Sequence, residues 1–271
     1  MEESYSLPQR AMAEVIGTAL LVLVGPGSVV ATLVLAGDSQ PAISGADLLG
    51  ISFAFGLVIA ALVYAIGKVS GCHINPAVTF ALAVTKRFPW REVPAYWGAQ
   101  LVGGTLGALG IWAAFTQTGI DFGLGHASFN EDTYSWGAAI FAEAVGTGIL
   151  MFAILGIVDK RSPSEFAGLI IGGVVVAIIM IFGPITAASL NPARAFGPEV
   201  VLGIGDGATT WSQFIPVYVL PGLVGAAVAA FLYDFLATPR IVERPIKQAV
   251  TNPDEVTDTS ADGAREPASV R

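Results

Sequence analysis

Two copies of the tripeptide Asn-Pro-Ala, at residues 75–77 and 191–193, carry the most specific chemistry in this sequence. Asn is a strong helix N-cap, and Pro is favoured at the first helical position because its missing N–H needs no partner there. Each copy, Asn75-Pro76-Ala77 and Asn191-Pro192-Ala193, therefore predicts the start of a helix. A helix N-terminus holds roughly half a positive charge. Such a site would bind the oxygen of a polar molecule and repel a cation.

The apolar stretches that begin at the two motifs are too short to cross a membrane. Residues 77–86 and 193–203 each reach about half of a ~30 Å hydrocarbon core at ~1.5 Å per residue. Both are predicted to be re-entrant half-helices. The backbone before each Asn must then be non-helical, which is tolerated at membrane depth only where it lines a polar cavity. The residues expected to line that cavity are Gly71, Cys72, His73, Ala187 and Ser189.

The composition places the chain among integral membrane proteins. Of its 271 residues, 54% are hydrophobic and 13% are charged, with a mean hydropathy of +0.70. Charged residues make up about a quarter of a typical soluble domain. The net charge of −8 argues against nucleic acid as a partner, because nucleic-acid binding needs basic patches. Six segments reach the ~20 apolar residues of a spanning helix, near 9–35, 47–68, 91–116, 136–158, 165–183 and 213–236.

The Lys and Arg residues predict the orientation of these segments. With six crossings, every Lys and Arg except Arg194 falls in the termini or connections on one side. That side is predicted to be cytoplasmic, which makes the chain a multi-pass protein of the plasma membrane with both termini in the cytoplasm. Arg194 follows the second motif directly. A charge at membrane depth is costly and marks a permeation pathway by default.

The chain contains an internal repeat. Residues 13–18, Ala-Glu-Val-Ile-Gly-Thr, recur as residues 142–147, Ala-Glu-Ala-Val-Gly-Thr, and an Asn-Pro-Ala motif follows each copy. The halves, about 9–116 and 136–236, each hold three spanning helices and one half-helix. Because three is odd, the second half is inverted relative to the first. The predicted domains are a transmembrane domain at 1–240 and an acidic, disordered cytoplasmic tail at 241–271.

Inversion brings the N-termini of the two half-helices together near the membrane midplane. Their positive ends disfavour cations, including hydronium, in a narrow passage. A water molecule between the carboxamides of Asn75 and Asn191 must turn its oxygen towards both donors. Its hydrogens are then poorly placed to continue a proton wire. The sequence therefore predicts a pore that passes small neutral molecules and excludes ions.

These features resemble the aquaporin and glycerol-facilitator family of major intrinsic proteins. The doubled Asn-Pro-Ala, Arg194 and the Ala-Glu-x-x-Gly-Thr signatures carry the resemblance, which covers about residues 10–237. The runs at 70–77 and 88–94 are most similar to archaeal M-type aquaporins. The resemblance implies an all-α membrane fold of six transmembrane helices and two re-entrant half-helices, assembled as a homotetramer in the lipid bilayer.

The resemblance also implies roles for individual residues. Four side chains narrow the family's pore near its outer mouth. The matching positions in this chain are Phe55, Ile179, Ala188 and Arg194. Glu14 and Glu143 match carboxylates that accept hydrogen bonds from the re-entrant loops, and His73 matches a histidine in the cytoplasmic half of the pore. Cys72 is either a pore-facing thiol or a small packing residue.

The filter positions favour water as the solute and glycerol as a second one. Water-selective members usually carry His at the position of Ile179, and typical glycerol facilitators carry Gly, so the expected constriction has an intermediate width. Ala195 and Glu199 stand where glycerol facilitators typically have Asp and a basic residue. Tyr218 gives an aromatic where water channels usually have Trp. These three positions indicate water.

Two other functions share these sequence features. Within the family, the alternative is a facilitator of glycerol or other small neutral solutes. From another class, a secondary transporter also uses inverted repeats and broken helices. Against it, the sequence offers no intramembrane acid for a substrate or ion site beyond the two supporting glutamates. An enzyme, a metal site and a cofactor are not expected, because no nucleophile–base set or metal-ligand cluster is present.

Overall fold

The computed structural model describes residues 4–37 and 43–238, and the predicted tail at 241–271 lies outside these ranges. Within them, six helical segments are long and apolar enough to cross a membrane, which confirms the predicted number. They comprise α1 (Leu7–Ala36), α2 (Gly45–Ser70), α4 (Val93–Asp121), α5 (Trp136–Val158), α6 (Ala167–Thr186), and a continuous segment made of α8 (Trp211–Gln213), η4 (Phe214–Val219) and α9 (Leu220–Ala237). All contacts described below lie in the compact unit that ends at Phe235.

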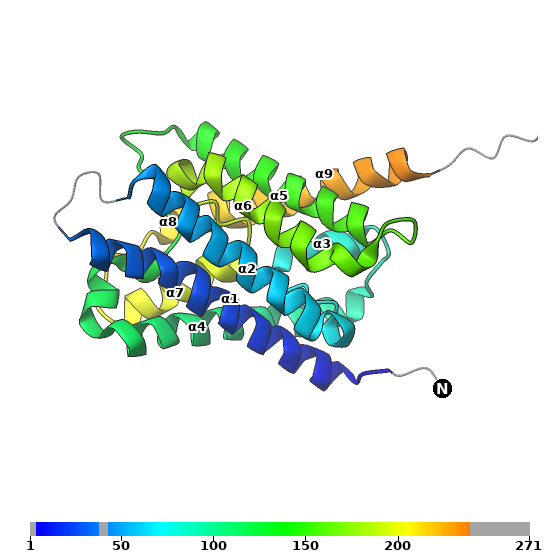
Figure 1. Cartoon of the computed structure of the whole chain (residues 1–271), viewed down its shortest axis with the longest axis horizontal. Coiled ribbons are helices and arrows are strands. Elements are labelled where there is room, and N and C mark those ends of the chain that lie inside the picture. Colours follow the sequence, from blue (N-terminus) through cyan, green and yellow to red (C-terminus); the bar gives the residue numbers. More distant parts are fainter. Residues whose placement is uncertain (1–3, 38–42, 239–271) are drawn as a thin grey trace, which may run out of the picture. The chain divides into compact units, whose positions relative to one another are not determined.

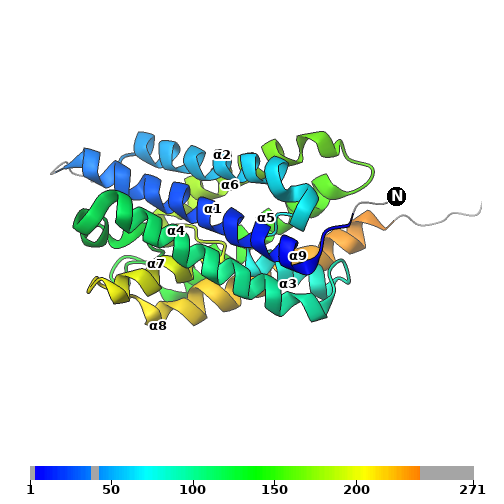
Figure 2. The same ribbon diagram turned by 90° about the horizontal axis from the view of Figure 1, so that it is seen from below.

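Two shorter helices, α3 (Pro76–Val84) and α7 (Pro192–Ile204), follow the Asn-Pro-Ala motifs as predicted. Asn75 caps α3, its side-chain oxygen accepting the N–H of Ala77 at 2.8 Å. Asn191 caps α7 in the same way. In both views the two half-helices lie towards opposite ends of the long helices, α7 beside one end and α3 beside the other (Figures 1 and 2). This arrangement confirms half-helices that enter the bundle from opposite sides.

Glycines hold the two halves of the bundle, and one half-helix, at close range. A Cβ at Gly172 of α6 would overlap the carbonyl oxygen of Gly56 of α2, so these helices cross backbone to backbone. Gly104 of α4 and Gly197 of α7 form a second such contact, which seats the second half-helix. Small residues at interfaces allow this close approach of helices in lipid.

The outer surface of the bundle is apolar. Each spanning segment exposes large hydrophobic side chains, among them Met12, Leu57, Val102, Phe141, Ile181 and Phe231. Charged and polar side chains, by contrast, are buried inside, including two glutamates and one arginine that are at most 1% exposed. An apolar exterior around a polar interior is the arrangement expected of a protein surrounded by lipid.

Candidate functional site

The two loops that precede α3 and α7 share one unusual backbone conformation. Residues at four, three and one positions before each Asn have a positive φ, a region that non-glycine residues rarely adopt. These residues are Gly71, Cys72 and Ile74 in the first loop, and Ala187, Ala188 and Leu190 in the second. Strain of this kind is of order 1–3 kcal/mol per non-glycine residue and persists only where surrounding contacts hold it. The same conformation therefore needs a matching support in each half.

Glu14 supplies that support in the first half. Its carboxylate accepts hydrogen bonds from the Ser70 hydroxyl at 2.6 Å, the His73 N–H at 2.9 Å and the Ile74 N–H. The Gln100 amide donates a further bond at 2.8 Å. The side chain is buried in α1, but its charge accepts these four hydrogen bonds. They offset the high cost of an unpaired buried carboxylate.

Glu143 has the corresponding contacts in the second half. Its carboxylate accepts bonds from the Thr186 hydroxyl at 2.7 Å, the Ser189 N–H at 2.8 Å and the Leu190 N–H at 2.7 Å. Both glutamates thus bind the two backbone N–H groups directly before an Asn cap. The family resemblance implies such contacts for these two carboxylates.

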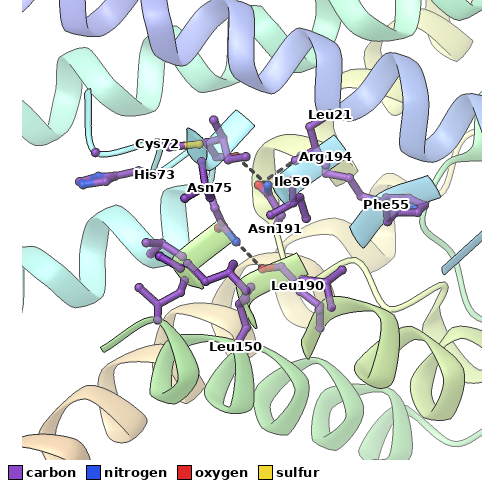
Figure 3. Close-up of a pocket in the computed structure, with 18 of the residues that line it drawn as sticks. Leu21, Phe55, Ile59, Cys72, His73, Asn75, Leu150, Leu190, Asn191 and Arg194 are labelled. Atoms are coloured by element: carbon purple, nitrogen blue, oxygen red, sulfur yellow. Dashed lines mark hydrogen bonds between the residues drawn. The ribbon is translucent and has the colours of Figure 1, made fainter. Parts of the chain in front are cut away.

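The two Asn caps cross-link the loops. The Asn75 Nδ2 donates to the carbonyl oxygen of Leu190 at 2.8 Å, and the Asn191 Nδ2 donates to that of Ile74 at 2.7 Å. These two bonds are drawn as dashed lines in Figure 3. They bring the N-termini of α3 and α7 together, as the inverted repeat predicts. Each carboxamide carries two N–H donors, so one donor of each Asn remains for a molecule beside it.

A cavity of about 270 Å³ runs past this junction. Its wall includes Val158 at the end of α5 and Ala167 at the start of α6, and also Phe55 and Arg194. Ten of the predicted site residues form its wall: Phe55, Gly71, Cys72, His73, Asn75, Ile179, Ala188, Ser189, Asn191 and Arg194.

The remaining predicted site residues lie behind this wall. Pro76, Ala77, Pro192 and Ala193 are buried in the first turns of the half-helices, and the two glutamates lie behind the loops. Ala187 packs in the apolar cluster that contains Tyr218.

The wall has a polar and an apolar part. The polar groups come from the two loops and half-helices. The aliphatic residues come from the spanning helices, and include Leu21, Ile59, Val63, Leu150, Ile154, Ile171 and Val175. A molecule in the cavity therefore meets hydrogen-bonding groups from the loops and hydrocarbon from the surrounding helices.

Phe55 and Arg194 meet at one end of the cavity. The guanidinium carbon of Arg194 lies 5.4 Å from the centre of the Phe55 ring, within cation–π distance. Ile179 and Ala188 line the same cavity and are each 3% exposed. Figure 3 shows Phe55 and His73 on opposite sides of the two asparagines. Within the described residues, Arg194 is the only charged side chain in the cavity wall.

Sequence reasoning missed two polar residues that complete the first loop. Gln100 of α4 donates through Nε2 to Glu14 and, at 3.0 Å, to the Thr79 hydroxyl. The Thr79 hydroxyl in turn donates to the Asn75 carbonyl at 3.1 Å and lies 3.1 Å from Nδ1 of His73. The signal was present, because a polar amide inside a spanning segment needs a buried partner.

Glu199, which the sequence analysis singled out, does not line the cavity. Its buried carboxylate accepts the Thr210 N–H at 2.8 Å and the Thr210 hydroxyl at 2.7 Å, which fixes the turn between α7 and α8. In the loop between α4 and α5, burial lowers the pKa of the His126 imidazole, and the Glu199 carboxylate opposes that shift. His126 donates its Nδ1 proton to the Gly123 carbonyl at 3.0 Å.

An apolar bundle with an internal cavity, in which two inverted half-helices meet through their N-termini, defines a membrane channel. The described residues contain no group of three or more His, Cys, Asp or Glu side chains that could hold a metal ion.

The chain belongs to the major intrinsic protein family, whose model matches residues 1–233. It is 45% identical over 246 residues to a probable aquaporin AqpM of Archaeoglobus fulgidus, covering 86% of this chain and 98% of that protein. It is 44% identical over 250 residues to aquaporin AqpM of Methanothermobacter marburgensis, covering 86% and 99%. Among solved structures, the aquaglyceroporin from Plasmodium falciparum matches with a TM-score of 0.76 at 26% identity, covering 86% of this chain and 98% of that one. The family consists of channels, so the chain is a channel and not an enzyme.

Proposed function

We propose that the protein is a passive channel that conducts water down osmotic gradients, passes glycerol more slowly, and excludes protons and ions. The observation that carries this proposal is the pair of reciprocal bonds from Asn75 to Leu190 and from Asn191 to Ile74. These bonds leave one N–H donor of each carboxamide beside the cavity. Two relatives named as aquaporins support water as the main solute.

Proton exclusion follows from how a water molecule sits at this junction. Its oxygen accepts from both carboxamides, so its hydrogens point along the cavity in directions that interrupt a chain of proton transfers. The positive ends of α3 and α7 and the charge of Arg194 add an electrostatic barrier to any cation. A water molecule carries no net charge, so this electrostatic barrier does not hold it back.

Phe55, Ile179, Ala188 and Arg194 are proposed to select the solute. Ile179 is shorter than an aromatic ring and presents no polar group, so the constriction should admit a molecule with a CH backbone as well as water. The hydroxyl groups of glycerol can bond to Arg194 while its carbons contact Ile179 and Phe55. The structural likeness to a protein described as an aquaglyceroporin supports glycerol as the second solute.

The cellular setting is part of the same proposal. The distribution of Lys and Arg supports a plasma-membrane protein with cytoplasmic termini, built as one domain at 1–240 with inverted repeats at about 9–116 and 136–236, and an acidic tail at 241–271. A homotetramer is proposed from the family resemblance.

The proposal is tested by paired stopped-flow measurements on liposomes that contain the purified protein. Osmotic shrinkage should become faster than in empty liposomes, with a low activation energy and no increase in proton leak. Glycerol entry should rise less than water flux. Unchanged shrinkage in vesicles that contain folded protein would overturn the water-channel proposal.

Replacing Ile179 by Gly is expected to raise glycerol flux. Lowering the steric barrier by ~1 kcal/mol corresponds to about a fivefold increase. Val63 is the matched control: it lines the same cavity and lies seven residues before Ser70, as Ile179 lies seven before Thr186. Val63→Gly should change glycerol flux less, because no arginine faces it across a constriction. A fall in glycerol flux in Ile179→Gly, with water flux unchanged, would contradict the filter assignment.

Mercurial reagents are expected to reduce the water flux of the native protein by at least half. Cys72 is the only cysteine of the chain and lines the cavity, so a mercury atom on its sulfur would narrow the passage. Cys72→Ser should conduct water normally and resist the reagent. Equal inhibition of both proteins in the stopped-flow assay would show that the thiol is not the target.

A further inference from the structure

The two halves of the bundle differ at one buried place beside the filter. In the first half, the Tyr96 hydroxyl donates to the carbonyl oxygen of Ser70 at 2.8 Å. Tyr218 is the corresponding residue in the second half and is only 2% exposed, yet its hydroxyl has no hydrogen-bond partner within the described part of the chain. Four residues after Tyr96 stands Gln100, which fills the space near Glu14, whereas Gly222 stands four residues after Tyr218.

Arg194 brings a second set of unpartnered polar atoms to the same region. Its side chain is 1% exposed, and its Nε and Nη1 atoms are buried without a hydrogen-bond partner among the described residues. The η4 turn, which carries Tyr218, packs against both α7, which carries Arg194, and α5, which carries Glu143. Tyr218 also packs in one cluster with Ala195, the residue that follows Arg194. The unpartnered atoms of the two side chains thus belong to one buried neighbourhood.

Glu143 has spare hydrogen-bonding capacity in this neighbourhood. Its Oε2 atom accepts one bond, from the Leu190 N–H. The corresponding Oε2 atom of Glu14 accepts two, from Ile74 and Gln100. In the first half, the Gln100 amide supplies the second hydrogen bond to this oxygen, and the second half has Gly222 in place of that amide.

The helix that carries Tyr218 is locally rewound. Residues Phe214–Val219 form the π-helical turn η4, whereas Tyr96 lies in regular α-helix. π-Helical turns are rare and frequently occur at functional sites, because the wider turn changes the direction of a side chain. Pro216 inside this turn and Pro221 after it account for the irregular winding. The turn gives Tyr218 a local backbone that differs from that of Tyr96.

We propose that Tyr218 is a positioning residue for Arg194, acting through a buried water that bonds to the Tyr218 hydroxyl, to Nε or Nη1 of Arg194, and to Glu143. A buried water typically makes about three hydrogen bonds to polar groups that otherwise lack partners, and this neighbourhood offers that number. The water fixes the guanidinium against Phe55 and so sets the width of the filter. This inference rests on the proposed water and glycerol conduction.

The test compares Tyr218→Phe with Tyr96→Phe, which makes the same chemical change at the corresponding place in the other half. Tyr218→Phe frees Arg194 to move, so the ratio of glycerol to water permeability should change at least threefold, measured by stopped-flow on liposomes. Tyr96→Phe loses its bond to Ser70 and should unfold at a lower temperature, but its permeability ratio should stay that of the native channel.

An unchanged ratio in folded Tyr218→Phe, or an equal change in both variants, would overturn the inference. A crystal structure of the native protein that resolves waters gives a second readout, independent of folding of the variants and of transport. It should show a water within hydrogen-bond distance of both Tyr218 and Arg194, and an empty or apolar contact there would overturn the inference as well. Absence of water flux in the native channel would instead count against the proposed function.

Discussion

Replacing Glu143 by Gln is expected to destabilise the folded protein by about 3 kcal/mol or more, since a hydrogen bond to a charged group contributes about 1.5–3 kcal/mol and at least two such bonds weaken. Gln keeps one acceptor oxygen, but its NH2 group then faces the N–H of Leu190 or of Ser189, and two donors cannot bond to each other. The loop before Asn191 loses its support while its strained backbone remains. Glu14→Gln should behave similarly, because Glu14 binds the matching loop.

The measurement is thermal unfolding of the purified protein in detergent, followed by tryptophan fluorescence. Glu165→Gln is the matched control, because it makes the same chemical change at an exposed residue. The unfolding temperature of Glu165→Gln should match that of the native protein, whereas Glu143→Gln should unfold several degrees lower. Equal unfolding temperatures for all three proteins would mean that the buried carboxylates do not hold the loops.

Replacing Arg194 by Val is expected to open the channel to protons and small cations. A charge at ~4 Å contributes about 4 kcal/mol at an effective dielectric constant of ~20, and each 1.4 kcal/mol is about tenfold in an equilibrium. Removing the only charge in the described cavity wall should therefore raise cation permeability by several hundredfold. Val78 already occupies the corresponding position in the first half and lines the same cavity, so the fold accommodates Val in this setting.

This second prediction is checked with a pH-sensitive dye trapped in liposomes, alongside water flux. Arg91→Val is the control, because Arg91 has a side chain that is 85% exposed and does not line the cavity. Arg91→Val should keep protons out, and both variants should still conduct water. Proton leak at the native level in Arg194→Val would show that the half-helix dipoles and asparagines suffice for exclusion.

The sequence predicted the features that follow from length, hydropathy and repetition. The six spanning segments, the half-helices that begin after Asn75 and Asn191, and the inversion of the halves all agree with the structure. These features are long or repeated, so many residues report on each of them. The place of Arg194 in the cavity wall could also be predicted, because a lone charge among apolar residues needs a polar surface.

Other features of the site have no local signal. The reciprocal bonds from the asparagines depend on carbonyl groups whose direction is set by positive φ angles. Residue types such as Ala188 and Leu190 do not predict a positive φ. The π-helical turn at Phe214–Val219 does have a partial signal, because Pro216 lies inside it and Pro221 follows it, and proline removes a backbone donor and distorts a helix. Ala187 is expected in the pore wall because it belongs to the non-helical loop before Asn191, whereas its side chain packs against the apolar cluster that contains Tyr218. Numbering from a motif gives the order of residues and not the direction of each side chain.

The crossed bonds of the asparagines also impose an order on biosynthesis. Asn75 and its partner Leu190 are 115 residues apart in the sequence, and Asn191 and its partner Ile74 are 117 residues apart. The first loop can therefore bind Glu14 as soon as the first half has entered the membrane, but Asn75 has no partner until about half of the second half, up to Leu190, has been translated. Contacts between residues so distant in sequence form late and slowly. The junction at the centre of the pore thus forms only after the second loop has been made, and a ribosome that stops before Leu190 releases a chain with an unfinished pore.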